Sequence, residues 1–176
     1  ASDVYKRQVS ILVSTIDSGG AEKQAVLLAI QLSKHTDVNL IVLYGGHTEY
    51  KGNVDLLTKS SVKVHRLNGS MLLKTIRIRE LLKESHTDVL LNYLTMPDLL
   101  GSFLGKRLKI SVYNGIRNSR LPRSKMLIEK WAHNHWATAT IYNCYSGADY
   151  FEKFGFRKDK NICLLYTSDA ADEEDS

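Results

Sequence analysis

Short apolar runs alternate with longer stretches of helical periodicity along most of this 176-residue chain. Parallel strands that are covered on both faces have near-continuous apolar sequences, whereas a strand near a sheet edge alternates apolar and polar positions. Residues 62–67 show the second pattern, and the other runs show the first. The chain is therefore predicted to form strands at residues 9–14, 38–44, 62–67, 88–94, 110–114 and 138–143, and helices at residues 21–34, 54–59, 71–84, 97–106, 124–136 and 146–154.

The alternation of strands and helices predicts an α/β fold with a doubly wound parallel sheet and helices on both faces. The helix at residues 71–84 is expected to bury Met71, Ile78 and Leu81 and to expose Lys74. Ligands of such sheets bind beyond the carboxyl ends of the strands. We therefore expect functional residues in the loops at residues 16–20, 45–53, 92–96 and 115–123.

The connection between the first strand and the first helix predicts an anion-binding turn. Gly19 and Gly20 follow Asp17 and Ser18, and the helix is expected to begin at Ala21. Glycines let a ligand approach the backbone closely, and the free N–H groups at a helix start favour negative charge. A Gly-Gly pair also occurs in turns that bind nothing. The turn points first to a phosphate-bearing or otherwise anionic small molecule.

A second candidate site follows the strand at residues 110–114. Arg117, Asn118 and Arg120 come directly after it, and the planar donors of arginine suit carboxylates and phosphates. The alternative is a basic surface loop without a ligand. Asn92 and Tyr93 end the strand at residues 88–94 and are expected at the same edge, unless Asn92 only satisfies local backbone groups.

The two ends of the chain are related at the level of DNA. Residues 1–8 can be encoded by DNA whose reverse complement, read one base in, encodes residues 163–170. Such an inverted repeat is typical of transposon-end adapter DNA that has been translated, and segments of this kind are left out of fold reasoning. We therefore expect one natural domain at residues 9–162, cut from a longer gene, with adapter-derived extensions at residues 1–8 and 163–176.

These extensions hide the charge of the natural part. Removing their two basic and six acidic residues from the 24 Lys and Arg and 19 Asp and Glu of the chain leaves a net charge of +9. This charge suits an acidic partner, such as a nucleotide diphosphate, an anionic lipid surface or nucleic acid. No apolar run reaches the roughly 18 residues of a membrane span. Cys144 is the single cysteine of the natural part, which excludes a disulfide framework and fits a reducing cytosol.

The chain lacks the motifs of several enzyme classes. It has no P-loop, no nucleophile elbow, no zincin helix and no Gly-x-Gly-x-x-Gly after its first strand, which argues against a dinucleotide-binding domain. His133 and His135 are two positions apart on an expected helix, so they point in different directions and cannot share a metal. We assign no metal site and no cofactor. Of the histidines, His47 alone is placed for a role, in the loop at residues 45–53.

Several segments, in order along residues 9–162, resemble bacterial glycosyltransferases of the GT-B fold and the retaining family-four type. The most specific of them is Gly19-Gly20-Ala21-Glu22 after the first strand. The others are residues 88–92, 115–120, 125–136, 141–146, 154–156 and 160–162. The resemblance implies the N-terminal, Rossmann-like half of a GT-B fold, which holds mainly the acceptor.

The resemblance also implies a reaction and its site residues. A sugar would move, without a metal, from a nucleotide-diphosphate donor to a hydroxyl of a glycan or lipid-linked acceptor. The N–H groups of Gly19 and Gly20 would face the donor diphosphate. The acceptor side would comprise Asn92, Tyr93, Arg117, Asn118 and Arg120.

Some family features have no counterpart in this chain. Relatives place a histidine after a central strand, where this chain has Asn92-Tyr93 and Asn114-Gly115, so no catalytic base is assigned. The nucleotide-binding second domain lies outside the chain, so the fragment is expected to have little or no activity. The parent enzyme is expected in the cytoplasm, with peripheral contact to the anionic inner membrane face.

Three alternatives remain open from the sequence. A nucleotide-sugar epimerase would share the two-domain architecture. A non-catalytic anion-binding domain of the flavodoxin or receiver kind would need an acidic cluster, and only Asp17 and Asp98 are near the expected edge. A nucleic-acid binder would suit the charge, but the chain lacks interleaved aromatic and basic positions on a strand, so no nucleic acid is expected. The donor sugar, the acceptor, the stereochemical outcome and the oligomeric state stay undetermined.

Overall fold

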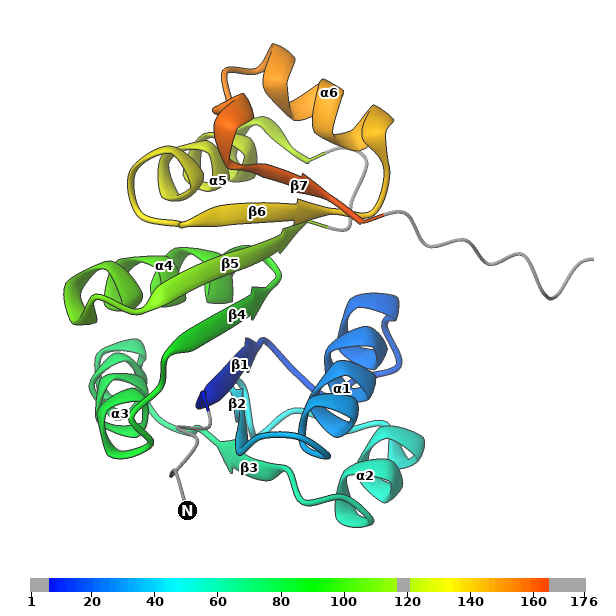
Figure 1. Cartoon of the computed structure of the whole chain (residues 1–176). Helices are drawn as coiled ribbons and strands as arrows, with labels where there is room; N and C mark the ends of the chain where they lie inside the picture. The colour runs from blue at the N-terminus through cyan, green and yellow to red at the C-terminus, as the bar shows by residue number, and fades with distance from the viewer. Residues whose placement is uncertain (1–6, 117–120, 165–176) are drawn as a thin grey trace, which may run out of the picture.

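The computed structural model describes residues 7–116 and 121–164. They form a parallel sheet with helices against both faces, which confirms the predicted α/β class (Figure 1). The strand order is β3-β2-β1-β4-β5-β6-β7, and every neighbouring pair is parallel. The described strands are β1 (Val9–Val13), β2 (Val38–Val42), β3 (Lys63–Arg66), β4 (Val89–Tyr93), β5 (Ser111–Ile116), β6 (Ala139–Tyr142) and β7 (Asn161–Cys163).

The direction of the strand order changes between β1 and β4. Open α/β sheets bind ligands at such a switch point, beyond the carboxyl ends of the strands. The register pairs Val13 of β1 with Tyr93 of β4, and Tyr93 with Gly115 of β5. The carboxyl ends of three central strands therefore meet at one edge of the sheet.

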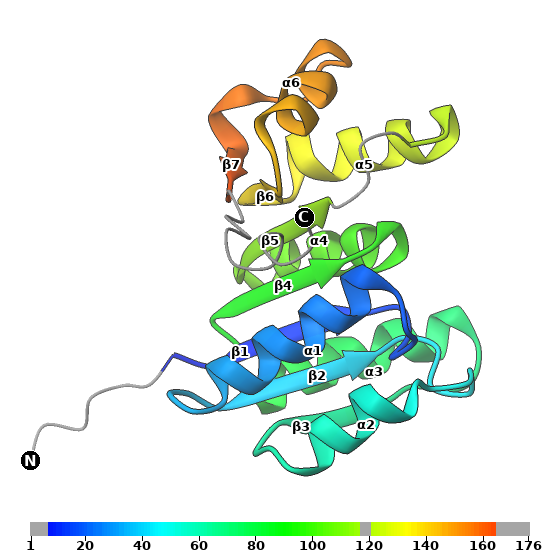
Figure 2. The same cartoon turned by 90° about the vertical axis from the view of Figure 1, so that its right-hand side faces the viewer.

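The helices divide between the two faces of the sheet (Figures 1 and 2). The helices α1 (Gly20–Leu32) and α2 (Lys51–Thr58) lie on one face. The opposite face carries α3 (Met71–Glu84), α4 (Thr95–Leu108) and α5 (Arg123–His135). Beyond them, α6 (Tyr145–Lys153) and the 3-10 turn η1 (Lys158–Lys160) complete the end of the sheet at β6 and β7.

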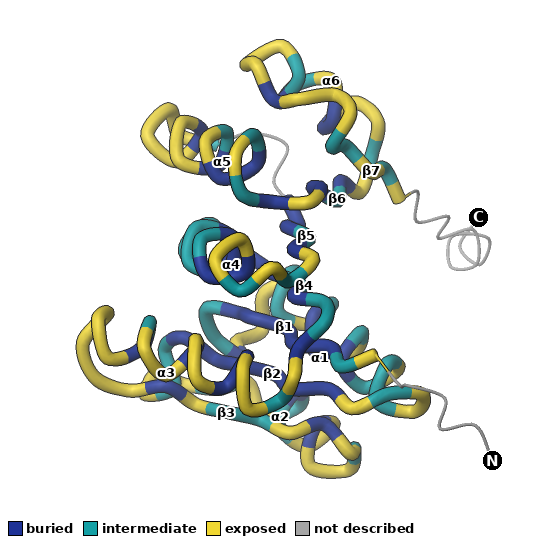
Figure 3. The backbone as a smooth tube through the Cα atoms, turned by 60° about the vertical axis from the view of Figure 1, so that its left-hand side comes forward, coloured by how far each residue is buried: buried dark blue, intermediate teal, exposed yellow. Residues whose placement is uncertain are grey.

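Alternating side chains of the strands form a separate apolar layer on each face. Ile11 packs with the α1 side, and Leu12 packs with the α3 and α4 side. The inner strands are largely buried, whereas the edge strands β3 and β7 have no buried residue, and the outer faces of the helices are exposed (Figure 3). A third cluster around Phe151 joins α5 and α6 to the end of the sheet.

Two glycines let α4 approach the sheet closely. A Cβ on Gly101 would overlap the Asn92 side chain of β4, and a Cβ on Gly105 would overlap Val112 Cγ2 of β5. Because protein interiors are packed at crystal density, neither position has room for a methyl group without movement of its neighbour.

The structure corrects several predicted boundaries and one predicted helix face. The helix α2 begins at residue 51 rather than 54, and α4 extends beyond the predicted 97–106 at both ends. On α3, Ile78 and Leu81 are buried as expected, but Met71 is 36% exposed. Lys74 is buried instead of exposed, with its Nζ 4.5 Å from the ring centre of Tyr44.

Two elements near the end of the described chain were not expected from the sequence, η1 and β7. The strand β7 includes Cys163, the first residue of the predicted extension at 163–176, and the N–H of Leu164 donates to the carbonyl of Tyr142. None of the helices in the two described ranges is long and apolar enough to cross a bilayer.

Candidate functional site

The start of α1 forms an open, uncapped helix terminus at the switch point. Gly19 is the N-cap in extended conformation and, without a side chain, makes no capping hydrogen bond to the first turn. Both Gly19 and Gly20 are exposed, and a Cβ built on Gly20 would meet no atom within 4 Å. The first N–H groups of a helix lack intrahelical partners, so this turn can bind an anion through its backbone.

One carboxylate competes for the same turn. The side chain of Glu22, in the first turn of α1, lies directly against Gly19. Its Oε1 accepts a long hydrogen bond of 3.4 Å from Thr15 Oγ1. A negative side chain near a helix start is stabilised by the same positive potential that would attract a phosphate. An anionic ligand at Gly19 must therefore displace the Glu22 carboxylate.

The arginine-rich loop follows β5 and precedes α5 in the chain. Arg117, Asn118 and Arg120 lie outside the described residues, so their assignment to the site stays a prediction. The flanking residues fix where the loop begins and ends: β5 ends at Ile116, and α5 begins at Arg123. The loop thus leaves the sheet at the carboxyl edge that also carries the Gly19-Gly20 turn.

The structure places Asn92 and Tyr93 in the interior rather than in an open cleft. Asn92 is fully buried, and its Nδ2 donates to Asn114 Oδ1 at 2.9 Å. Ser102 of α4 bonds to the same Asn114 amide, at 3.1 and 3.0 Å. Tyr93 is 5% exposed and packs in the apolar layer under α1. Both side chains therefore pack inside the domain in this structure, and their assignment to the acceptor side stays a prediction.

Sequence reasoning missed a pair of carboxyl groups next to this edge. Asp98 in the first turn of α4 and Glu129 in α5 are both almost fully buried, and their carboxyl groups influence one another. Burial raises the pKa of Asp98 well above its usual range, and the nearby Glu129 raises it further. Burial likewise raises the pKa of Glu129 to about 7, against the opposing effect of a hydrogen bond with Thr95. The only sequence signal was an acidic residue in the first turn of a helix.

The carboxyl pair lines a small cavity between α4, α5 and the end of β5, together with Leu94, Thr95 and Gly115. Leu94 precedes α4 with φ +77°, a conformation that costs a non-glycine residue about 1–3 kcal/mol. Strained residues of this kind cluster at functional sites. The strain at Leu94 therefore marks the β4–α4 junction as part of the candidate site.

One of the histidines, His133, is a buried structural residue. His133 is 1% exposed and bonds through Nδ1 to Thr140 Oγ1 and through Nε2 to the carbonyl of Arg157. Burial lowers the pKa of His133 to about 4, so this imidazole is neutral and structural. His47 contacts the ring of Tyr44 edge-on. In residues 7–116 and 121–164, no group of three His, Cys, Asp or Glu is arranged to hold a metal ion.

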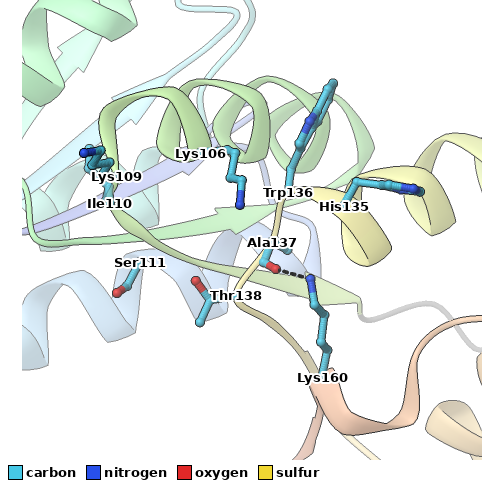
Figure 4. Close-up of a pocket in the computed structure, with 9 residues that line it drawn as sticks. All are labelled: Lys106, Lys109, Ile110, Ser111, His135, Trp136, Ala137, Thr138 and Lys160. Carbon is cyan, nitrogen blue, oxygen red and sulfur yellow. Dashed lines mark hydrogen bonds between the residues drawn. The ribbon is translucent and has the colours of Figure 1, made fainter.

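A wider groove lies at the opposite, amino edge of the sheet (Figure 4). Its volume is about 530 Å3, and its basic residues are Lys106, Lys109 and Lys160. The Lys160 ammonium donates to the carbonyls of His133, Asn134 and Ala137, so it caps the end of α5. This groove is separate from the Gly19-Gly20 turn, and none of the predicted site residues lines it.

Part of the chain is similar in sequence to a curated bacterial protein. No family model matches the chain. Over 93 residues the chain is 31% identical to a curated relative from Campylobacter jejuni subsp. jejuni, GalNAc-α-(1→4)-GalNAc-α-(1→3)-diNAcBac-PP-undecaprenol α-1,4-N-acetyl-D-galactosaminyltransferase. The match covers 49% of this chain and 26% of that relative.

The solved structures extend the likeness to most of the chain. Anabaena HepE in complex with UDP-glucose superposes with a TM-score of 0.74 at 13% identity, over 90% of this chain and 43% of that one. UDP-N-acetylglucosamine 2-epimerase from Rickettsia bellii gives a TM-score of 0.61 at 15% identity, over 90% and 44%. The fold is thus a Rossmann-like α/β domain of the kind found in GT-B glycosyltransferases. The chain spans less than half the length of these neighbours.

Proposed function

We propose that this chain forms the acceptor-side domain of a glycosyltransferase. The enzyme moves a sugar from a nucleotide-diphosphate donor to a hydroxyl group of a glycan or lipid-linked acceptor. The observation that carries the proposal is the open, uncapped start of α1 at Gly19 and Gly20, beside the β1–β4 switch point. The glycosyltransferase activity named for the curated relative and the nucleotide sugar bound in the HepE structure support it.

The donor diphosphate binds against the start of α1. Backbone N–H groups at Gly19 and Gly20 stabilise the negative charge that develops on the departing diphosphate. The Glu22 side chain turns away from Gly19 when the diphosphate arrives. No residue of this chain is assigned as catalytic base.

The acceptor binds at the ends of β4 and β5. Arg117, Asn118 and Arg120 orient it, and arginine donors suit a diphosphate-linked lipid of the kind named for the Campylobacter relative. Asn92 and Tyr93 hold β4 in place from the interior. The basic surface adds peripheral contact with an anionic membrane on the cytoplasmic side.

A second domain, outside these 176 residues, completes the donor site. The neighbours are more than twice as long as the segment that they share with this chain, which supports this proposal. We expect the isolated chain to have little or no transferase activity, because the nucleotide would be held mainly by the second domain.

The structural likeness to an epimerase supports one alternative, a nucleotide-sugar epimerase of the same architecture. The two functions differ in their need for an acceptor. In the full-length enzyme encoded by the parent gene, we expect release of the nucleotide diphosphate from its sugar only when a glycan or lipid-linked acceptor is added. Epimerisation of the donor sugar without an acceptor would overturn the transferase proposal, and the acceptor-free reaction is the matched control.

A further inference from the structure

The small cavity that Asp98 and Glu129 line lies at the carboxyl edge of the sheet, between the junction after β4 and the end of β5. Leu94 and Thr95 line it from one side, and Gly115 from the other. The strands β1 and β5 flank β4, so about 10 Å of sheet separates this end of β5 from the strand that leads to α1. The cavity therefore lies where the acceptor of the proposed reaction binds, one strand beyond the donor side.

Two carboxyl groups form the polar wall of this cavity. Asp98 and Glu129 are 1% and 3% exposed. Burial raises the pKa of Glu129 to about 7, and the side chain of Thr95 opposes this effect by favouring the charged form. In the described ranges, no residue forms a hydrogen bond with Asp98 Oδ1. Asp98 is therefore the member of the pair with a buried oxygen left for a ligand.

Other buried polar atoms near this edge also lack partners, but they do not belong to the cavity. Asn92 Oδ1 lies against Gly101 of α4, and the Tyr142 hydroxyl lies in the apolar cluster around Phe151. Neither Asn92 nor Tyr142 lines the cavity. Among the buried side-chain atoms without a partner in the described part of the chain, only Asp98 Oδ1 belongs to a residue at this site.

The size of the cavity suits one small group. Its volume is about 20 Å3. On this measure, a space of roughly 10–15 Å3 or more holds one water molecule. The remaining walls include the apolar side chains of Leu94, Ile116 and Leu121. A phosphate or a whole sugar ring is too large for this space, whereas one hydroxyl group of a larger ligand fits.

The chemistry of the walls selects an uncharged group that both donates and accepts hydrogen bonds. Two neighbouring buried carboxyl groups do not readily ionise together, so one of them keeps its proton and the other is an acceptor. An anion would be repelled by the ionised group, and a charge buried in so small a space is costly. A hydroxyl group accepts from the protonated carboxyl through its oxygen and donates its hydrogen to Asp98 Oδ1.

We propose that this cavity receives one hydroxyl group of the acceptor, which donates a hydrogen bond to Asp98. Asp98 is then a specificity-determining residue of the acceptor site. The inference rests on the proposed function, whose acceptor it describes as a sugar with a second hydroxyl besides the reacting one. An acceptor with hydrogen in place of this hydroxyl leaves Asp98 buried without a partner, and for that reason binds less well.

A double-mutant cycle between the enzyme and its acceptor tests the inference. The full-length enzyme encoded by the parent gene is given methyl glycosides of glucose, galactose and their N-acetylamino forms, and analogues with a single non-reacting hydroxyl replaced by hydrogen. For the unmodified enzyme, one such replacement should lower kcat/KM about tenfold or more. In Asp98→Ala the same replacement should change kcat/KM less than about twofold, because the hydroxyl has already lost its partner. The KM for the nucleotide sugar should stay the same.

Further variants separate this role from damage to the fold. Asp98→Asn keeps an oxygen that accepts a hydrogen bond, so it should keep the preference for the complete acceptor. Asp98→Leu is apolar and of similar volume, and it should lose the preference as Asp98→Ala does. Asp149→Ala removes an exposed carboxyl of α6 and should behave as the unmodified enzyme. Circular dichroism checks the fold of each variant.

The outcomes distinguish this inference from the proposed function. Equal losses in the unmodified enzyme and in Asp98→Ala at every hydroxyl would mean that the acceptor does not enter the cavity, and would overturn the inference alone. A loss of preference in Asp98→Asn as large as in Asp98→Ala, or transfer to none of the glycosides, would also contradict it. Failure of the proposed function would instead appear as epimerisation of the donor sugar without an acceptor.

Discussion

The carboxyl groups of Asp98 and Glu129 lie together in the interior between α4 and α5, where both residues line one small cavity. Two neighbouring carboxylates in a desolvated site cannot both ionise without a large cost in free energy. The pKa values of both groups are therefore raised, and the pair tends to hold a proton near neutral pH. The pair lies beside the strained Leu94 and the end of β5.

The pair gives the fold an unusual pH dependence. Because the pKa of Glu129 is raised to about 7 in the folded protein, the folded state binds more protons than the unfolded chain between about pH 4.5 and 7. The contribution of Glu129 to the free energy of unfolding is present below this window and is lost as the pH rises through it, by up to about 1.4 kcal/mol per pH unit. The raised pKa of Asp98 acts in the same direction.

Urea unfolding of the unmodified protein and of Glu129→Gln, at a series of pH values, measures this effect. The neutral amide cannot ionise, so the stability of the unmodified protein relative to the variant should fall from pH 5 to pH 8. His133, with its pKa lowered to about 4, contributes the opposite slope and cancels in this difference. The exposed Glu80→Gln is the control substitution. If the free energies of unfolding of Glu129→Gln and of the unmodified protein change with pH in parallel, the folded protein does not hold an extra proton on Glu129, and the prediction is wrong.

The close approach of α4 to β5 predicts a strong effect of one methyl group. Gly105→Ala forces a Cβ into Val112 Cγ2, and overpacking of this kind costs about 1–3 kcal/mol. Gly20→Ala is the matched control, since its Cβ meets open space at the start of α1. We expect a lower urea midpoint for Gly105→Ala alone. Equal midpoints for the two variants would mean that α4 can move away from the sheet at little cost.

The buried amide network below the switch point predicts a second stability effect. Asn114→Ala removes the partner of both Asn92 Nδ2 and Ser102 Oγ. Buried polar groups left without partners cost about 1–3 kcal/mol each, so the variant should lose about 2–4 kcal/mol. Asn134→Ala, which removes hydrogen bonds near the surface, is the comparison. A melting temperature for Asn114→Ala no lower than that of Asn134→Ala would show that water replaces the missing amide.

Most of the architecture followed from local sequence patterns. The near-continuous apolar runs identified β1, β2 and β4, and the helix at residues 71–84 has the predicted bounds. The helix predicted at residues 146–154 ends before Gly155, whose positive φ of 90° is typical of a glycine that follows a helix. These features depend on residues close together in the chain, which is why periodicity and turn chemistry predicted them.

The features that the sequence did not predict depend on contacts between distant residues. Lys74 is buried because its aliphatic chain and ammonium pack on Tyr44, thirty positions away. The Asp98–Glu129 pair forms only when α4 and α5 pack together. The strand β7 has three residues, too few to show a pattern, and it is formed by pairing with β6. Asn92 lies in the interior, where its amide donates a hydrogen bond to Asn114 of the neighbouring strand.

The most direct test of the account follows the backbone amides of the isotope-labelled full-length enzyme encoded by the parent gene by NMR while UDP is added. We expect the largest shift changes at Gly19, Gly20 and Ala21, because the diphosphate binds the free N–H groups at the start of α1. Gly20→Val, whose side chain meets open space and leaves the fold intact, should abolish them. Unchanged amides at this turn, or changes confined to the groove at Lys106, Lys109 and Lys160, would contradict the central claim.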